Sequence, residues 1–250
     1  MKKRCVALIP ARSGSKRIRN KNIRLLAGHP LIAYTISTAI KSEIFSRVIV
    51  STDNDKISKI AQYYGAEVPF LRPAEYAQDA SPDIEWLKYT LQKLELNKQS
   101  IEFFSILRPS SPFRSVSMLE KAWELFLSDK DADSLRAVER CLQHPAKMWI
   151  INGNRMNPVI KNPESSGIEW YSKPIQELPK VYVQNSSLEI AKCEIPLMTL
   201  SIAGTKIIPF ITDKLEGYDI NTEKDWIYAE YLIKKGLVIL PHVDNKPYLG

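Results

Sequence analysis

The stretch ALIPARSGSKRIRNKNIRLLAG, residues 7–28, decides how this chain is expected to fold. It opens within an apolar run, Cys5–Ile9, which has the length and character of a short buried strand that ends at Pro10. Glycine in the following loop would let the main chain approach a phosphate, and Lys and Arg would supply charge. The loop residues that we assign to such a site are Arg12, Gly14, Ser15, Lys16, Lys21 and Asn22.

This loop matches neither of the two common phosphate-binding patterns. Lys16 follows Ser15, so the GxxxxGK spacing of a Walker A loop is absent, and GxGxxG is absent as well. The alternative is a solvated basic loop, a description that fits Arg17, Arg19 and Arg24 equally well. The place of the loop directly after the first strand favours an anion site.

Apolar runs alternate with amphipathic stretches along most of the chain. We expect strands at Cys5–Ile9, Val48–Val50, Val68–Leu71, Phe103–Leu107, Ser134–Val138 and 206–211. We expect helices at Leu31–Lys41, Lys56–Tyr64, Ile84–Leu96, Met118–Leu127 and 222–235. This alternation predicts an α/β fold with a mostly parallel sheet and helices on both faces. Ligands of such sheets bind at the carboxyl ends of the strands.

Residues 140–200 interrupt this rhythm within what we interpret as one domain, residues 1–250. The stretch is rich in Pro, Asn and Ser, then gives two strand-like runs, Val181–Val183 and Leu188–Ala191. We interpret it as an excursion from the sheet, in the form of a hairpin arm. The expected helix caps are Asp83 or Ser81 for the third helix, Ser115 or Ser117 for the fourth and Asn221 for the last.

Charge and composition exclude several classes of protein. The net charge is +7, but residues 1–42 hold ten Lys and Arg and no acid, and the rest of the chain is slightly acidic. A local site for a small polyanion explains this better than a nucleic-acid surface, because residues 12–24 contain no aromatic side chain. No apolar run is long enough for a membrane span or a signal core, and the three cysteines lack CxxC spacing. We expect a cytoplasmic protein.

An ordered set of motifs resembles the acylneuraminate cytidylyltransferases. IPARSGSKRIRNKN, residues 9–22, is similar to the family signature IPARxGSKxxxxKN. The segments that follow it in the family's order are VSTDND (50–55), FLRPAEYAQD (70–79), LRPSSPFR (107–114), HPAKMW (144–149), QNSSLEIA (184–191) and YDINTEKDW (218–226). The resemblance implies a three-layer, Rossmann-like nucleotide-diphosphosugar transferase fold with a protruding dimerisation arm. The implied enzyme is a homodimeric, Mg²⁺-dependent CMP-sialic acid synthetase type that uses CTP and an acidic nine-carbon sugar.

The resemblance also implies roles for individual residues. Those expected to bind the nucleotide are Arg12, Gly14, Ser15, Lys16, Lys21, Asn22, Arg72 and Ser81. Those expected to line the acceptor sugar are Arg108, Ser110, Ser111, Arg114 and Asn185. Asp219 and Asn221 are expected at the metal, and Arg12, Lys21 and Asp219 are the catalytic candidates. Plainer roles stay open: Asp53 as a helix cap, Ser110–Pro112 as a turn, and Arg72 paired with Glu75.

Two positions depart from the family pattern. Asn221 stands where a second metal-binding aspartate is usual, and an amide contributes no charge to a Mg²⁺ site. Arg108 stands where glutamine is usual, and its guanidinium could pair with a sugar carboxylate or a phosphate. The alternatives are a cytidylyltransferase for an eight-carbon (Kdo-like) acid sugar, a degenerate nucleotide-binding protein without turnover, and last a nucleic-acid-binding protein.

Overall fold

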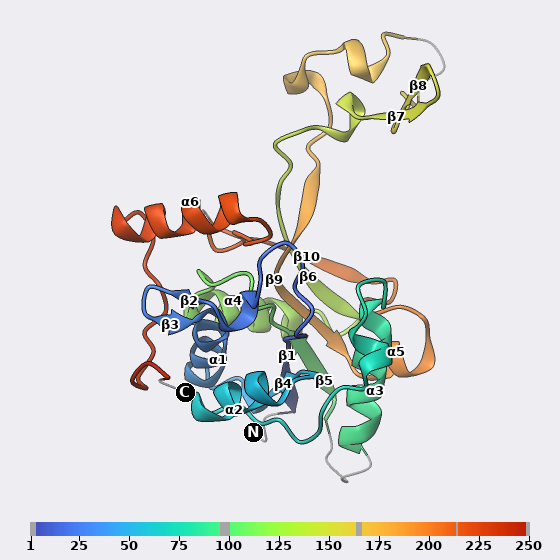
Figure 1. Ribbon diagram of the computed structural model, residues 1–250. Helices are drawn as coiled ribbons and strands as arrows, with labels where there is room; N and C mark the ends of the chain where they lie inside the picture. Colours follow the sequence, from blue (N-terminus) through green and yellow to red (C-terminus); the bar gives the residue numbers. More distant parts are fainter. Residues whose placement is uncertain (1–3, 96–100, 164–166, 214, 249–250) are drawn as a thin grey trace.

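The computed structural model describes residues 4–95, 101–163, 167–213 and 215–248. A six-stranded sheet runs through the body of the molecule in the order β10-β6-β9-β5-β1-β4 (Figure 1). Its strands are β1 (Cys5–Pro10), β4 (Phe45–Ser51), β5 (Phe103–Ile106), β6 (Ser134–Arg140), β9 (Tyr182–Lys192) and β10 (Ile207–Ile211). β9 lies antiparallel between β5 and β6, and the other neighbouring pairs are parallel. The predicted mostly parallel α/β fold is confirmed.

Helices cover both faces of this sheet. Those packed on one face are α1 (Leu31–Lys41), α2 (Asp55–Tyr63), α4 (Val116–Ser128) and α6 (Glu223–Lys234). Those on the other face are α3 (Asp83–Glu95) and the short α5 (Glu194–Met198). None of the described helices has the length and apolar character needed to cross a bilayer. The three layers predicted from the alternating pattern are therefore present.

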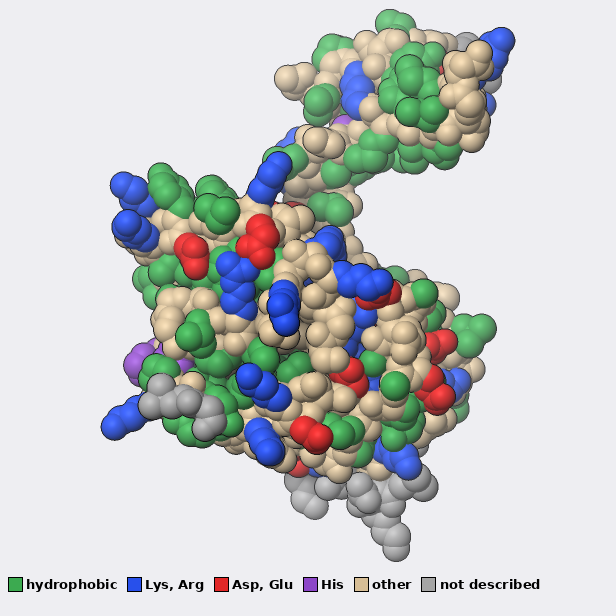
Figure 2. Space-filling model, viewed as in Figure 1, with side chains coloured by type: hydrophobic (Ala, Val, Ile, Leu, Met, Phe, Trp, Pro, Cys, Tyr) green, Lys and Arg blue, Asp and Glu red, His purple; other side chains and the backbone are tan. Residues whose placement is uncertain are grey.

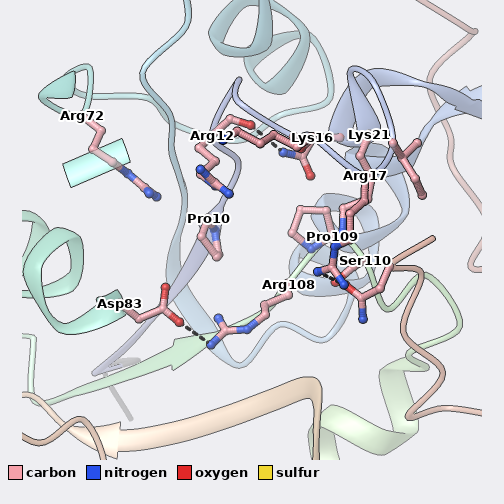
Figure 3. A pocket seen from close by; sticks show the side chains of 14 residues that line it. Pro10, Arg12, Lys16, Arg17, Lys21, Arg72, Asp83, Arg108, Pro109 and Ser110 are labelled. Carbon is pink, nitrogen blue, oxygen red and sulfur yellow. Dashed lines mark hydrogen bonds and ion pairs between the residues drawn. The ribbon is translucent and has the colours of Figure 1, made fainter. Parts of the chain in front are cut away.

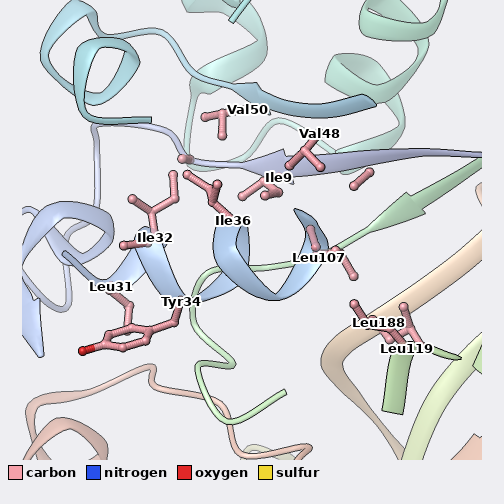
Figure 4. Packing of buried hydrophobic residues seen from close by; sticks show 14 of the residues in the cluster. Ile9, Leu31, Ile32, Tyr34, Ile36, Val48, Val50, Leu107, Leu119 and Leu188 are labelled. Atoms are coloured by element: carbon pink, nitrogen blue, oxygen red, sulfur yellow. The ribbon is translucent and has the colours of Figure 1, made fainter. Parts of the chain in front are cut away.

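The larger part of the core lies between α1 and the sheet (Figure 4). Eight of the eleven residues of α1 are buried, which explains why its sequence, LIAYTISTAIK, is apolar on nearly every side. Ile9 and Val50 on the sheet meet Ile32 and Ile36 of the helix. Each such side chain contributes about 1.5–3 kcal/mol by leaving water, so this layer holds the carboxyl end of β1 rigidly in place.

Four local expectations were wrong. Val68–Leu71 forms no strand: the chain makes an isolated β-bridge to β4 at Glu67, and Pro69 then lacks the N–H that pairing requires. The runs expected at 181–183 and 188–191 belong to one strand, β9. Thr222, not Asn221, caps α6, because it forms a capping box with Asp225. Ser81 does not cap α3 either; its hydroxyl donates to the Glu75 carbonyl.

Of the two caps expected for α4, Ser115 is the one observed, since its hydroxyl accepts from the N–H of Met118. Asp83 is the first residue of α3, whose expected last residue, Leu96, lies outside the described residues. Several short elements were not anticipated. They are the ladder of β2 (Leu25–Leu26) with β3 (His29–Pro30), and the 3₁₀ turns η1 (Lys21–Ile23), η2 (Ala74–Ala77), η3 (Pro145–Lys147), η4 (Trp170–Ser172) and η5 (Ile175–Glu177).

An arm projects from the body between β6 and β9 (Figure 1). It carries the small hairpin of β7 (Trp149–Asn152) and β8 (Arg155–Pro158). The excursion is shorter than the 140–200 predicted, because β9 and α5 return to the body from Tyr182 onward. Apolar side chains cover much of the arm's visible surface (Figure 2).

Candidate nucleotide site

A cavity of about 210 Å³ lies where β1 and β5 end and the loops after them meet. Basic side chains line it from three directions: Arg12, Lys16, Arg17 and Lys21 from the loop after β1, Arg72 from the segment after β4, and Arg108 from the turn after β5. Figure 3 shows the Arg12, Arg72 and Arg108 guanidinium groups around one space. Such a convergence of cations at the carboxyl ends of strands suits a small polyanion.

The loop after β1 is held by a carboxylate on the neighbouring strand end. Asp53 Oδ1 accepts from the Ser13 N–H at 2.8 Å, and Oδ2 accepts from the Ser13 hydroxyl at 2.6 Å. Asn22, which is buried, donates to the Arg12 carbonyl at 3.1 Å and closes the loop from its other end. Asn54 rather than Asp53 caps α2, so the plainer alternative for Asp53, a helix cap, is wrong.

Arg12 and Lys16 share one acidic partner, Asp79. Arg12 Nη1 lies 2.7 Å from Asp79 Oδ1, and Lys16 Nζ is paired with Oδ2. Hydrogen bonds from Lys16 and Arg12 hold the pKa of Asp79 below its usual range, so this carboxylate is charged at neutral pH. Arg12 also donates to the Ala77 carbonyl at 3.2 Å. In this state, Asp79 in the loop at residues 74–79 pairs with two of the three cations, Arg12 and Lys16, that the sequence assigned to phosphates.

Lys21 lies deeper, against the turn that precedes α6. Its ammonium donates to the Ile220 carbonyl at 2.9 Å. Burial lowers the pKa of Lys21, and the nearby Asp219 charge partly opposes this shift. A partly desolvated ammonium interacts more strongly with an incoming phosphate than one in bulk water, because the local dielectric is lower.

Arg72 is fixed on the opposite wall. Its Nε donates to the Ser51 hydroxyl at 3.0 Å, Nη2 donates to the Ser51 carbonyl at 2.9 Å, and its guanidinium lies 4.7 Å from the centre of the Trp86 ring. Burial lowers the pKa of Arg72 to about 10, so it remains cationic at neutral pH. Arg72 therefore pairs with β4 and Trp86, and the expected pairing with Glu75 is absent from the described contacts.

The turn after β5 supplies Arg108, Pro109 and Ser110 to the cavity. Arg108 Nη2 donates to Asp83 Oδ2 at 2.7 Å and to Glu189 Oε1 at 2.9 Å. The turn expected at Ser110–Pro112 is tied to the α6 turn, because the Ser110 carbonyl accepts from the Ile220 N–H at 2.8 Å. This contact brings the segment around Asp219 to the rim of the cavity.

Asp219 and Asn221 form a polar pair at that rim. Asp219 Oδ2 accepts from Asn221 Nδ2 at 2.5 Å and from the Ser186 hydroxyl at 2.9 Å. Asp219 Oδ1 is buried and has no hydrogen-bond partner within the described part of the chain. Asn221 Oδ1 accepts from Arg17 at 3.3 Å. An orphaned carboxylate oxygen is costly unless a ligand completes it.

Of the predicted site residues, Arg12, Ser15, Lys16, Lys21, Asn22, Arg72, Arg108, Ser110 and Asn221 line the cavity. Gly14, Ser81, Ser111 and Arg114 do not. Arg114 is fully buried and donates to the Ser187 and Arg108 carbonyls and to the Thr35 hydroxyl. Its burial lowers its pKa to about 9.

A second cavity of about 600 Å³ adjoins the root of the arm. It is lined by Asn185 and Asp219 together with Glu139, Arg140, Leu142, Val183, Gln184, Ser186, Thr212, Leu215, Gly217 and Tyr218. The Asn185 amide donates to the Thr212 hydroxyl at 3.0 Å and accepts from Ser187, so Asn185 also braces the strand. The hydrogen bond from Asn221 to Asp219 links the two cavities, because Asn221 lines the first and Asp219 lines the second.

Sequence reasoning missed Asp79, Asp83 and Glu189, the acids that hold the cavity's cations. Asp79 and Glu189 occur inside motifs that were recognised, but the motif order carries no information about which cation each acid would meet. Asp83 was assigned only a capping role. Arg108 is 25 positions from Asp83 and 81 positions from Glu189 in the sequence. Such ion pairs depend on the order of strands in the sheet, which the sequence pattern alone does not give.

Comparison with solved structures identifies the fold. CMP:2-keto-3-deoxy-manno-octonic acid synthetase in complex with CTP matches with a TM-score of 0.67 at 16% identity, over 93% of this chain and 99% of that one. 4-diphosphocytidyl-2C-methyl-D-erythritol synthase from Anaerococcus prevotii matches with a TM-score of 0.61 at 14% identity, over 92% and 98%. The fold is that of the nucleotidyltransferases.

The sequence comparisons identify the family. The cytidylyltransferase family pattern matches residues 6–125. CMP-N,N'-diacetyllegionaminic acid synthase of Legionella pneumophila is 33% identical over 92% of this chain and 97% of its own length. N-acylneuraminate cytidylyltransferase of Escherichia coli is 32% identical over 92% of this chain, which spans about half (52%) of that relative. The chain belongs to the cytidylyltransferase family that includes these proteins, and the predicted resemblance is confirmed.

Proposed function

We propose that this chain transfers the CMP half of CTP to a nonulosonic acid and releases pyrophosphate. The observation that carries the proposal is the convergence of Arg12, Lys16 and Lys21 with Arg72 on one cavity at the carboxyl ends of β1 and β5. The relatives named for N-acylneuraminate, N,N'-diacetyllegionaminic acid and pseudaminic acid support a nonulosonic acceptor.

The reaction is an in-line displacement. The anomeric hydroxyl oxygen of the acceptor forms a bond to the α-phosphorus of CTP, the bond from that phosphorus to the bridging oxygen of pyrophosphate breaks, and the hydroxyl proton passes to solvent. Arg12 and Lys16 exchange Asp79 for phosphate oxygens and neutralise the leaving group, and Lys21 stabilises charge at the far end of the cavity. This chemistry depends on alignment and charge, and it needs no covalent nucleophile.

The proposal includes Mg²⁺ held by Asp219 and Asn221. Asp219 Oδ1 is buried and has no hydrogen-bond partner among the described residues, so it is the oxygen that would bind such an ion. No cluster of three or more His, Cys, Asp or Glu suited to a metal occurs among the described residues. One carboxylate and one amide nevertheless fit Mg²⁺, which proteins commonly bind through one or two side chains and substrate phosphates. When bound, the ion would neutralise phosphate charge and orient the reacting groups.

The proposal also includes a cytoplasmic homodimer that makes activated sugars for cell-surface polysaccharide. Exposed apolar side chains on the arm support the dimer: Ile150, Ile151, Met156 and Ile168 are 54, 73, 55 and 65% exposed. Clustered apolar surface of this kind is typical of protein–protein contacts.

The test is pyrophosphate release with each of the four nucleoside triphosphates and a panel of acid sugars, with and without Mg²⁺. We expect release only with CTP, a nonulosonic acid and the metal. Pyrophosphate release with an eight-carbon acid sugar instead would show that this sugar is the acceptor. Binding of CTP without turnover on any acceptor would favour a degenerate nucleotide-binding protein and contradict the proposal.

A further inference from the structure

A buried carboxylate next to the cavity is shared by two arginines. The Glu189 side chain is 4% exposed; its Oε1 lies 2.9 Å from Arg108 Nη2, and its Oε2 lies 2.9 Å from Arg136 Nη1. A buried carboxylate is tolerated only when its charge is compensated, and one guanidinium would be enough for that. With two, this group of three side chains keeps one net positive charge.

The sheet fixes the geometry of this group. Arg136 on β6 and Glu189 on β9 are directly opposite in the antiparallel pairing, so their side chains share one face of the sheet. Arg108 follows the end of β5, the strand on the other side of β9. Arg108 lines the nucleotide cavity, whereas Arg136 and Glu189 do not. The pair therefore supports Arg108 from outside the cavity.

Arg108 uses one of its three nitrogens for these contacts. Nη2 donates both to Glu189 and to Asp83, whose side chain is 44% exposed and hence screened by solvent. Nε and Nη1 of Arg108 donate to no acceptor among the described residues. Figure 3 shows Arg108 along one wall of the cavity with its end at Asp83. A guanidinium that is anchored at one nitrogen and open at the others suits an incoming carboxylate.

We propose that Arg136 and Glu189 are positioning residues that determine how Arg108 recognises the carboxylate of the acceptor sugar, an inference that rests on the proposed function. Glu189 holds the Arg108 guanidinium at the cavity wall. Arg136 compensates the Glu189 charge, so that the positive charge of Arg108 is available to the substrate. Arg136 is thus a specificity determinant that does not itself line the cavity.

The test compares an acid acceptor with its primary amide, which has nearly the same shape but no charge. Arg136→Gln leaves Glu189 with Arg108 as its one cation. We expect the preference of kcat/KM for the acid over the amide to fall about tenfold, through the KM of the acid, while the KM for CTP changes less than about twofold. Arg136→Lys keeps the charge and is expected to retain most of the preference.

A double variant separates positioning from simple damage to the fold. Arg136→Gln combined with Glu189→Gln removes both charges together, so no uncompensated carboxylate competes for Arg108, and we expect much of the preference to return. Arg47→Gln is the matched control, because Arg47 pairs with Glu67 in an ion pair on the β4 side of the sheet.

Four results would overturn the inference. An unchanged acid-to-amide preference in Arg136→Gln would show that Arg136 does not act on the acceptor. A rise in the KM for CTP as large as the rise in the KM of the acid acceptor would indicate general damage. No recovery of the acid-to-amide preference in the double variant would indicate the same. Absence of turnover by the wild-type chain with every acceptor would contradict the proposed function itself, and this inference with it.

Discussion

Lys21 is the cation whose contribution to activity is easiest to isolate. We expect Lys21→Ala to lower turnover by about 10²-fold or more, because the variant loses a charge that meets the phosphates in a partly desolvated setting. Its melting temperature should change little, since within the described part of the chain the ammonium makes a single hydrogen bond, to the Ile220 carbonyl. The measurement is pyrophosphate release beside thermal unfolding. Arg19→Ala, at an exposed position on the same loop, is the control, and near-normal turnover of Lys21→Ala would exclude the assigned role.

Asn221 offers a test of the metal site that does not depend on catalysis. Asn221→Asp replaces the hydrogen bond to Asp219 with two adjacent carboxylates, so the variant should be less stable without Mg²⁺. Mg²⁺ should then raise its melting temperature more than that of the wild type, and a lower Mg²⁺ concentration should support half-maximal turnover. Thermal unfolding of both proteins at increasing Mg²⁺ concentration, in buffer without calcium, measures the effect on melting temperature. Identical Mg²⁺ responses in the two proteins would mean that residue 221 does not contact the ion.

At the scale of elements, the loop at residues 74–79 competes with the substrate for Arg12 and Lys16. Asp79 is charged at neutral pH, so Asp79→Asn removes a full negative charge from the place where phosphate is expected. We expect the KM for CTP to fall about two- to fivefold at low salt, with a smaller change at high salt. Initial rates at varied CTP measure it. Glu75→Gln is the control on the same loop, and a higher KM in Asp79→Asn would show that Asp79 instead assists binding.

An element could be predicted from the sequence where adjacent residues determine its structure, and not where distant residues do. The run CVALI and the buried helix LIAYTISTAIK carry their structure in adjacent residues, and both were predicted correctly. Ser115, which caps α4, was one of the two caps expected for that helix. The stretch Val68–Leu71 was as apolar as a strand, but Pro69 and the exit of the chain at Glu67 prevented pairing. Thr222 displaced Asn221 as the cap, because Asp225 three residues later completes a capping box.

The residues of the candidate site also divide into those that a local motif predicts and those whose position depends on distant parts of the chain. The cations of the loop after β1 were found from sequence because they are neighbours in one motif. Arg114, which also lies in a recognised motif, faces the interior and braces Ser187 and Thr35. Its side-chain direction depends on packing between α1 and β9, which no local pattern records. The acids Asp79 and Glu189 were missed for the related reason that their partners are distant in sequence.

At the scale of the whole molecule, the arm is the surface that we expect a second copy to cover. Ile151→Lys together with Met156→Lys places two charges on exposed apolar positions of the hairpin. If the arm forms the dimer, the variant should sediment as a monomer at concentrations where the wild type is dimeric, because a buried unpaired charge opposes association. Ile239→Lys, at an isoleucine that is 89% exposed outside the arm, is the control. An unchanged sedimentation coefficient would place any dimer contact elsewhere.

The position of β9 has a consequence for how the chain is made. β9 spans Tyr182–Lys192, yet it lies between β5 and β6, which end at Ile106 and Arg140. Until residue 192 has emerged from the ribosome, β6 has no partner strand, because β9 and β10 both follow it in the sequence, and the edge of β5 that will face β9 is unpaired. Unpaired edges in a nascent chain recruit other strands. The growing polypeptide should therefore depend on chaperones most between the emergence of β6 and that of β9, although its N-terminal third already encodes the loop of cations.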